Sequence, residues 1–487
     1  MGSSMCLFIP ILLSFLFSMF LFLNTCSSFP TQPLCNDFER FALLQFKQSF
    51  VINESVSSDP SAYPKVSSWN PVETNDCCSW DGVQCDGITG HVIGLNLSSS
   101  QLYGSINSSS SLFHLVHLQM LSLFDNDFNH SQIPPSIRYL SNLTYLNLAF
   151  SGFVDQIPPE LLELSKLSFL RLDQNQFLKL QKPSLKSLVE NLTSLKHLYL
   201  GLVNIDSTVP HILANLSSLT SLGLTSCGLY GDFPNEIFKL PNLEILTIGN
   251  NQNLTGNLPE FHSSSPLQLL RLAYTGFFGK IPDSIGNLKS LYELDIRNCY
   301  FSGLVPTSLG NLTNLNLLRL SFNNFWGQVP FSLANLTQLN RLGLSYNSFS
   351  PQTLSWLGKQ TKLTSLDLSD INLYGSIPSS LKNLTQLTKL NLGDNQITGQ
   401  IPHCIGNLTQ LTLLCLGKNK LHGSIPQSIS RLPNLESLSL IANNLSGRVE
   451  LDSLLKLKNL TQLQLSGVHL SFPSYSIFNT TFQSFSF

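Results

Sequence analysis

A repeat of fixed length constrains this chain more than any local motif does. Leu387–Leu408 reads LTKLNLGDNQITGQIPHCIGNL, and Leu411–Leu432 reads LTLLCLGKNKLHGSIPQSISRL, so the same Leu, Asn, Gly and Pro positions return after 24 residues. A unit of this length cannot bury its apolar face alone, and a series of such units buries it by stacking. We therefore expect one elongated solenoid, where 487 residues would otherwise suggest about three independent globules.

Each unit opens with a Leu-x-Leu core, which returns about sixteen times from Val92 onward. Successive residues of a strand face opposite sides, so the two leucines face the interior and the middle residue faces solvent. The cores begin with Leu95-x-Leu97 and end with Leu463-x-Leu465. The fold class predicted is therefore α/β, with a parallel β-sheet on the concave face of the solenoid.

Three further positions of the unit have structural tasks. An Asn three residues after the core can donate to and accept from the backbone of its neighbours, which any buried polar group requires. The same position holds Cys227 and Cys299, which we therefore interpret as structural thiols. The Gly before Ile-Pro permits an unusual backbone, and the Pro fixes φ for the turn to the convex side. The expected ladder residues are Asn126, Asn175, Asn251, Asn323, Asn347, Asn395, Asn419 and Asn443.

Four units are irregular, and we expect them to change the convex side locally. They are Leu167–Leu192, Leu243–Pro259, Leu339–Gln360 and Leu435–Leu457.

A cysteine-containing segment precedes the repeats and is suited to cap them, because the first unit would otherwise expose its apolar interior. Its aromatic residues supply the cover: Trp69, Trp80 and a partly amphipathic helix pattern with Phe38, Phe41, Ala42, Gln45, Phe46 and Phe50. Its four cysteines suggest two disulfides. Cys35–Cys77 with Cys78–Cys85 is the economical pairing among three, and a zinc site is the rival interpretation.

The one apolar stretch of the sequence that approaches the length of a membrane span is Leu7–Leu23, at the N-terminus. Small residues follow it, with a suitable cleavage position before Phe29, so it is predicted to be a secretory signal peptide; a retained anchor is the alternative, since the leader lacks Lys and Arg. No later stretch is long enough to span a bilayer, so the mature chain as given is expected to have no membrane span. The predicted organisation is residues 1–28 signal peptide, 29–90 cap, 91–470 solenoid and 471–487 an atypical C-terminal tail.

The surface is weakly charged. Charged residues make up 11% of the chain and the formal net charge is −2, which gives no electrostatic basis for nucleic-acid binding. An extracellular chain can instead carry glycans on Asn-x-Ser/Thr sequons. The sequons are Asn53, Asn96, Asn107, Asn129, Asn142, Asn191, Asn215, Asn253, Asn311, Asn335, Asn383, Asn407, Asn444, Asn459 and Asn479.

Catalytic motifs are missing from the sequence. The ten histidines occupy different positions of the repeat, and neither a phosphate-binding loop nor a kinase signature occurs. We therefore predict a chain that is not an enzyme, with no cofactor and no metal site. Cys404 and Cys415 face different sides of the template and are expected to be free thiols.

The Gly-x-Ile-Pro form of the unit, behind a Cys…Cys-Cys-x-Trp…Cys cap, resembles the plant-specific class of extracellular leucine-rich repeat proteins. Phe38–Lys47 and Cys77–Val83 resemble most closely the plant receptor-like proteins. The resemblance implies a curved solenoid that binds a protein, peptide or glycan ligand at the cell surface or in the apoplast, in defence or developmental signalling. It implies that a membrane receptor kinase acts as partner or co-receptor. Family members continue through a transmembrane helix, so we expect this chain to be truncated, with plasma-membrane anchoring only in a longer form.

Solvent-facing strand residues supply the candidate ligand patch, because Arg and aromatic side chains are the types that anchor interfaces. The candidates are Arg271, Tyr274, Tyr292, Asp295, Arg297, Arg319, Phe322, Arg341 and Tyr346. Scattered, merely solvated side chains are the alternative interpretation. Two other functions stay open: a secreted inhibitor like the plant polygalacturonase inhibitors, and a non-functional fragment.

Overall fold

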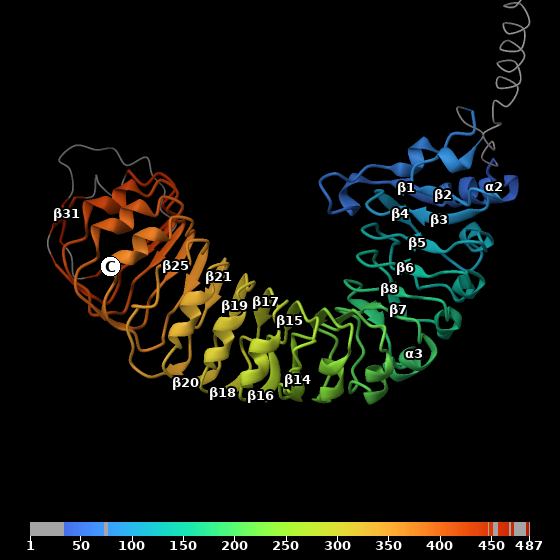
Figure 1. Ribbon diagram of the computed structural model, residues 1–487. Helices are drawn as coiled ribbons and strands as arrows, with labels where there is room; N and C mark the ends of the chain where they lie inside the picture. Colours follow the sequence, from blue (N-terminus) through green and yellow to red (C-terminus); the bar gives the residue numbers. More distant parts are fainter. Residues whose placement is uncertain are drawn as a thin grey trace, which may run out of the picture.

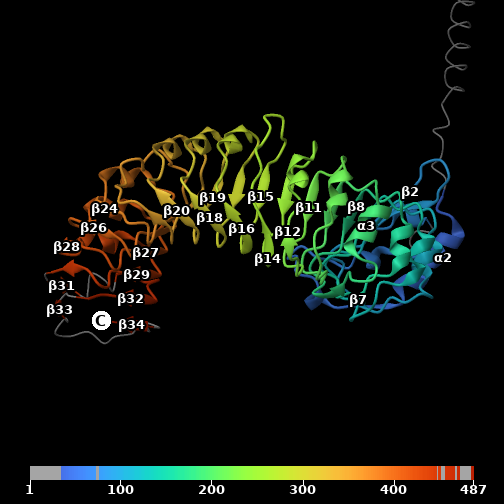
Figure 2. The ribbon, with the colours of Figure 1, turned by 90° about the horizontal axis from the view of Figure 1, so that it is seen from below.

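A computed structural model describes residues 34–72, 76–446, 448–450, 456–466, 469–471 and 484–486. The chain forms one curved arch, with the cap at one end and the C-terminal units at the other (Figure 1). Seen from below, the units lie side by side along the arch (Figure 2). The expected signal peptide and the sequon at Asn479 lie outside the described residues.

One long sheet runs through the arch. Its seventeen parallel strands follow chain order, and β2 adds to the first of them in antiparallel orientation. The bounds are β2 (Val83–Cys85), β3 (Val92–Asn96), β5 (Met120–Ser122), β6 (Tyr145–Asn147), β8 (Phe169–Arg171), β10 (His197–Tyr199), β11 (Ser221–Gly223), β13 (Ile245–Thr247), β15 (Leu269–Arg271), β17 (Glu293–Asp295), β19 (Leu317–Arg319), β21 (Arg341–Gly343), β23 (Ser365–Asp367), β25 (Lys389–Asn391), β27 (Leu413–Cys415), β29 (Ser437–Ser439), β32 (Gln462–Gln464) and β34 (Ser484–Ser486). The predicted parallel solenoid is confirmed.

The register places equivalent leucines side by side. Leu318 pairs with Leu294 on one side and with Leu342 on the other, and all three are buried. Repetition of this contact along the sheet makes one continuous apolar core. Burying one Leu side chain contributes about 2 kcal/mol, so the stacked leucines dominate the stability of every unit.

Short strands also pair beside the main sheet, where the chain turns toward the convex side. The longest set is β12 (Gly231–Asp232), β14 (Asn251–Gly256), β16 (Thr275–Gly279), β18 (Tyr300–Gly303), β20 (Asn324–Gly327) and β22 (Ser348–Phe349). The parallel pairs are β7 (Val154–Gln156) with β9 (Phe177–Lys179), β24 (Tyr374–Ser376) with β26 (Gln396–Thr398), β28 (His422–Gly423) with β30 (Asn444–Leu445), and β31 (Arg448–Glu450) with β33 (His469–Ser471). Gly399 illustrates the permissive glycine at this turn, with φ of +83°.

Single-turn 3-10 helices fill most of the convex side, and from η5 onward a Pro precedes each of them. This Pro has extended backbone and directs the chain into the helix. The helices are η4 (Ser111–His114), η5 (Pro135–Tyr139), η6 (Pro159–Glu163), η7 (His211–Asn215), η8 (Asn235–Lys239), η9 (Asp283–Asn287), η10 (Thr307–Asn311), η11 (Phe331–Asn335), η12 (Ser379–Asn383), η13 (His403–Asn407) and η14 (Gln427–Arg431).

The irregular units change this side, as expected. The lengthened unit at Leu167–Leu192 carries the α-helix α3 (Leu185–Asn191) in place of a 3-10 turn. In the unit at Leu243–Pro259, β14 pairs with β16 through a register shift. The unit at Leu339–Gln360 replaces its helix with turns, and its Gln352 side chain accepts from Val329 N at 2.7 Å. The fourth irregular unit lies partly outside the described residues.

The asparagine ladder joins neighbouring units. Asn323 donates from Nδ2 to the carbonyl oxygens of Leu320, in its own unit, and of Ile296, in the unit before, at 3.0 and 2.8 Å. Its Oδ1 accepts from Phe301 N at 3.0 Å. Asn126 and Asn175 make the same set of contacts. The ladder therefore satisfies the backbone groups that the chain leaves unpaired as it turns off the strand.

The two cysteines in the ladder positions behave as structural thiols. Cys227 donates to Leu200 O at 3.1 Å, and Cys299 donates to Leu272 O at 3.3 Å. Burial raises the pKa of the Cys227 thiol to about 12 and also raises the pKa of Cys299. Cys404 and Cys415 are half-buried and unpaired in the described part of the chain.

The cap contains the helix α2 (Asp37–Lys47), three short helices and the short strand β1 (Phe50–Ile52). The short helices are η1 (Glu54–Val56), η2 (Lys65–Ser68) and η3 (Cys77–Ser79), and β1 pairs antiparallel with β4 (Leu102–Gly104). Disulfides join Cys35 to Cys77 and Cys78 to Cys85, which confirms the economical pairing and rules out zinc at these thiols.

The apolar cover of the first unit comes from fewer aromatic residues than predicted. Trp69 and Trp80 are buried and stack with ring centroids 5.7 Å apart. Phe38 and Phe41, however, are exposed, so their expected role in the cover is wrong. The buried face of α2 is Glu39, Ala42, Leu43 and Phe46. These positions follow the i, i+3, i+4, i+7 spacing of a helix, and Phe38 and Phe41 fall on the opposite face.

The expected atypical tail contains a further strand of the main sheet. β34 pairs in parallel with β32, and Phe485 lies opposite Leu463. The sheet thus has one parallel strand more than the sixteen predicted cores. Within the described residues, no helix has the length and apolar character that crossing a membrane requires.

The ladder can be tested at Asn323. Asn323→Ala leaves the carbonyls of Ile296 and Leu320 without a donor, so we expect the free energy of unfolding to fall by about 2 kcal/mol. Denaturant unfolding measures this loss, and hydrogen exchange should show local opening around β19 and β20. The neighbouring Asn324 is exposed, so Asn324→Ala is the matched control. Equal stability of the two variants would contradict the proposed role of the amide.

The thiols give a second test. Iodoacetamide at pH 8 followed by mass spectrometry should label Cys404 and Cys415 in the folded chain and leave Cys227 and Cys299 unmodified. A thiol whose pKa is about 12 is roughly one part in ten thousand thiolate at this pH. Denaturation should expose all four. Rapid labelling of native Cys227 would show that its burial is wrong.

Candidate ligand-binding face

The repeat places the candidate residues in a few columns along the concave face. Arg271, Asp295 and Arg319 are the last residues of β15, β17 and β19, and they lie side by side in the register of the sheet. Arg341 opens β21, and Tyr292 directly precedes β17. The column predicted from the Leu-x-Leu pattern is therefore continuous in the sheet. Asp295, however, was expected to face solvent and is only 3% exposed, because the side chains of Arg297 and Arg319 cover and contact it.

Two buried acids hold the arginines of this surface in place. Glu293, at the start of β17, accepts a two-pronged ion pair from Arg271 at 2.5 and 2.8 Å. This hydrogen bonding raises the pKa of the Arg271 guanidinium. Asp295 contacts Arg319 at 3.2 Å and Arg297 at 3.5 Å. Both acids are more than nine-tenths buried, so their charges would be costly without these cations.

An aromatic flank borders the arginines. Tyr274, Phe322 and Tyr346 each follow a strand and have positive φ, at 61°, 55° and 53°. This conformation is uncommon for bulky residues, and it turns their side chains outward at the edge of the sheet. Phe322 and Tyr346 stack with centroids 4.3 Å apart, and the Arg297 guanidinium lies 5.6 Å from the centre of the Tyr274 ring. All three aromatic side chains remain more than a third exposed.

The arginines and the flank surround a shallow hollow of about 230 Å³. Its lining brings together Tyr274, Arg297, Arg319, Phe322 and Arg341, and the structure adds Ser321, Ser345 and Asp367. Four predicted residues lie outside this lining: Arg271, Tyr292, Asp295 and Tyr346, although Tyr346 stacks on Phe322. The hollow therefore gathers most, but not all, of the predicted patch.

Arg341 differs from the other arginines of the patch. It is exposed, and among the described residues it forms no ion pair, whereas Arg271, Arg297 and Arg319 each contact a buried acid. The Asp367 carboxylate lies in the same hollow, and its Oδ2 accepts a hydrogen bond from the Ser345 hydroxyl at 3.1 Å. The hollow thus offers an open guanidinium beside stacked aromatic rings, which suits a ligand with an acidic group and an apolar group.

A second hollow lies near the cap and was missed by the sequence reasoning. It has a volume of about 750 Å³, and Tyr103, Phe150, Phe177 and Leu202 line it with exposed apolar surface. Phe150 and Leu202 occupy the same positive-φ position as Tyr274. This hollow could have been predicted from the sequence, because the position two residues after each Leu-x-Leu core can be compared across all units.

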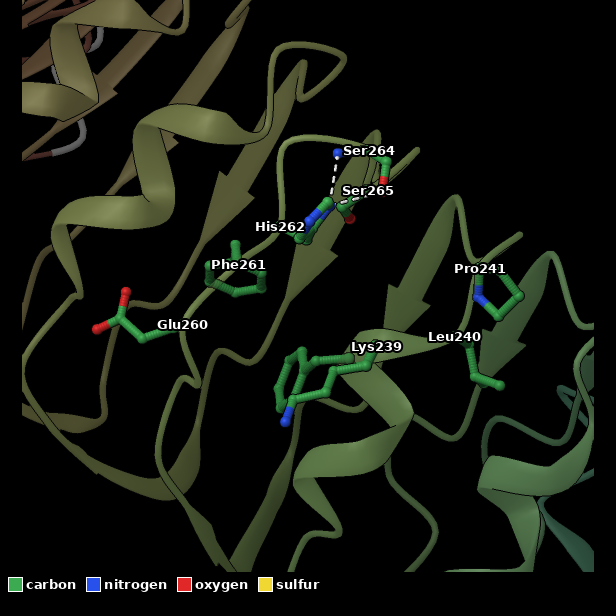
Figure 3. A pocket seen from close by; sticks show the side chains of 9 residues that line it. Lys239, Leu240, Pro241, Glu260, Phe261, His262, Ser264 and Ser265 are labelled. Carbon is green, nitrogen blue, oxygen red and sulfur yellow. Dashed lines mark hydrogen bonds between the residues drawn. The ribbon is translucent and has the colours of Figure 1, made fainter.

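A third hollow, of about 330 Å³, opens where the chain between β14 and β15 forms no convex helix (Figure 3). Lys239 comes from η8, and Glu260, Phe261 and His262 come from the helix-free segment. His262 Nδ1 lies 2.8 Å from the Ser264 hydroxyl, which is a local turn contact two residues along the chain. Within the described residues His262 has no hydrogen bond or ion pair with a carboxylate, Glu260 of the same hollow included, so the contact between His262 and Ser264 is not that of a catalytic triad.

The sequons lie mostly on the surface. Of those in the described residues, Asn142 is half-buried and the others are exposed. Asn142 accepts from Lys166 at 2.8 Å and donates to Val116 O at 3.1 Å. Six sequons end a convex helix: Asn191, Asn215, Asn311, Asn335, Asn383 and Asn407. Each precedes the strand of the next unit, whereas the aromatic flank follows the strands, so glycans at these sites would leave the patch open.

Comparisons with known proteins agree with this architecture. Residues 36–86 match the family model for the leucine rich repeat N-terminal domain, residues 240–373 match that for a leucine-rich repeat region, and residues 361–421 match that for the leucine rich repeat. These are repeat families and indicate no enzyme family.

Relatives in plants share much of the sequence. The chain is 39% identical over 296 residues to Receptor-like protein 6 of Arabidopsis thaliana, a match that covers 58% of this chain and 30% of the relative. It is 39% identical over 270 residues to Receptor-like protein Cf-9 of Solanum pimpinellifolium, covering 53% of this chain and 31% of the relative. The matched part therefore spans about a third of the length of these relatives.

Solved structures extend the similarity to nearly the whole chain. The receptor kinase HAESA from Arabidopsis, in complex with the peptide hormone IDA and the co-receptor SERK1, is 28% identical with a TM-score of 0.64, covering 89% of this chain and 82% of that chain. The plant peptide hormone receptor RGFR1 in complex with RGF2 is 28% identical with a TM-score of 0.59, covering 81% and 76%. From the repeat, the disulfide-bonded cap and these relatives together, we conclude that the chain is a leucine-rich repeat protein related to the receptor-like proteins of plants.

Proposed function

We propose that this chain is an extracellular recognition module that binds a peptide or a protein segment on the concave patch between β15 and β23. The observation that carries the proposal is the open guanidinium of Arg341 beside the stacked rings of Phe322 and Tyr346. The rest of the patch is rigid, because Glu293 and Asp295 fix the neighbouring arginines. A fixed surface loses little conformational entropy on binding, which favours affinity.

The similar solved ectodomains support a peptide over a glycan as the ligand. HAESA and RGFR1 are both in complex with peptides, and one HAESA complex also contains a co-receptor. By analogy, the ligand of this chain is an extended peptide that crosses the neighbouring strands, with an acidic group against Arg341. Signalling in defence or development then passes to a partner receptor kinase.

The proposal can be tested with peptides selected from a random library displayed on phage against the immobilised chain. Arg341→Glu reverses the charge of the open cation, so we expect the affinity of a selected peptide to fall at least tenfold, measured by calorimetry. Phe322→Ala, which removes the stacked ring, should cause a similar loss because aromatic anchors contribute about 2 kcal/mol at an interface.

Arg431→Glu is the matched control, since Arg431 is an exposed arginine at the end of the convex helix η14. It should leave peptide affinity unchanged, and circular dichroism should show the same fold for all variants. Selected peptides that bind the Arg341→Glu and Phe322→Ala variants as well as they bind the original chain would exclude the concave patch as the recognition site.

A further inference from the structure

Two histidines and a buried glutamate meet where the cap joins the first units. Glu39 belongs to α2, His91 directly precedes β3, and His117 lies before β5. Because Gly94 pairs with Met120, His91 and His117 occupy equivalent positions in neighbouring units. The repeat thus stacks them, and α2 brings the carboxylate to the same place.

Glu39 is an unusual residue for the apolar face of a helix. It is only 3% exposed. Its Oε2 accepts from Val92 N at 2.7 Å, and its Oε1 lies 3.2 Å from His91 Nδ1. A buried carboxylate carries a large desolvation cost, and one neutral backbone donor offsets only part of that cost. A positive charge beside Oε1 would therefore stabilise the buried Glu39 carboxylate.

His117 completes the cluster from the other side of His91. The two imidazole rings lie with centroids 3.8 Å apart and planes tilted by 29°. In the described part of the chain the His117 ring has this stacking contact and no hydrogen bond. Two imidazoles held this close would repel each other if both were protonated, whereas two neutral imidazoles can share one cation.

We propose that Glu39, His91 and His117 form a binding site for a divalent transition metal ion such as Zn²⁺. One carboxylate oxygen and one nitrogen of each ring all lie within 4.8 Å of one another. Ligand atoms around a tetrahedral zinc ion are separated by about 3.4 Å, so the half-buried rings must tilt out of their stack to point at one ion. Two His and one carboxylate are a ligand set that zinc accepts, with water in the fourth position.

The ion would have a structural consequence. Its three ligands come from the cap helix, from the start of the first repeat strand and from the start of the second, so it would clamp the cap onto the solenoid. The two disulfides do not do this, because all four of their cysteines lie within Cys35–Cys85. The site is independent of the concave patch, so either proposal can fail while the other stands.

Zinc chloride is the probe for this site, with the secreted chain purified without a histidine tag. Calorimetry should show one saturable Zn²⁺ per chain, and Zn²⁺ should raise the melting temperature, because an ion that binds the folded state stabilises it. Tetrahedral Co²⁺ bound in its place should show the visible absorption bands of that geometry.

Variants identify the ligands. His117→Gln and His91→Gln should each weaken Zn²⁺ binding by more than tenfold and abolish the rise in melting temperature. The melting temperature without metal should stay close to that of the original chain for His117→Gln, because His117 makes no contact with Glu39 through a hydrogen bond in the described residues. His211→Gln is the matched control, because His211 and Glu236 form an exposed His–carboxylate pair that lacks a second histidine. This variant should bind Zn²⁺ as the original chain does.

Glu39→Gln tests the carboxylate but also alters the contact with Val92 N. Zn²⁺ affinity is therefore compared only after circular dichroism shows that this variant is folded. The proposal is overturned if the original chain shows no saturable Zn²⁺ binding up to millimolar concentration. It is equally overturned if the His91 and His117 variants retain the affinity of the original chain.

Discussion

The amide of the buried asparagine ladder is the contact on which the solenoid depends. Stacked leucines provide most of the free energy, but they are not directional and would tolerate slippage between units. The ladder is directional: Asn347 donates to Leu344 O within its unit and to Leu320 O in the unit before, and its Oδ1 accepts from Phe325 N. Each such residue therefore fixes the register of one unit against the next, and every concave column follows from that register.

Fixed register explains why much of the functional surface could be predicted from sequence. The Leu-x-Leu pattern alone places Arg271, Asp295 and Arg319 in one column, and the structure pairs them as neighbours, although it buries Asp295. For the cap cysteines, the rule that adjacent cysteines cannot easily bond each other left two of the three pairings open. The economical one of these two is the pairing that the structure shows. These features depend only on period and on local stereochemistry.

Features that depend on side-chain contacts between units could not be predicted. The ion pairs of Glu293 and Asp295, and the stack of Phe322 on Tyr346, require the distance between neighbouring units, which no single unit reveals. The prediction of which face of the cap helix α2 is buried was wrong for a related reason. The apolar character of Phe38 and Phe41 suggested burial, but helix geometry favoured the face that contains Glu39.

The same constraint limits where this protein can encode specificity. The leucines, ladder residues, glycines and prolines are required by the fold. Only the strand positions between the buried leucines and the positive-φ positions after the strands are free to vary. In the candidate patch most of those positions contact one another: Glu293 pairs with Arg271, and Asp295 pairs with both Arg297 and Arg319. What remains open is Arg341 with its aromatic neighbours. The arginines beside Arg341 are already held by buried acids, so a ligand gains less from them than from the unpaired Arg341. That difference makes the small open area selective.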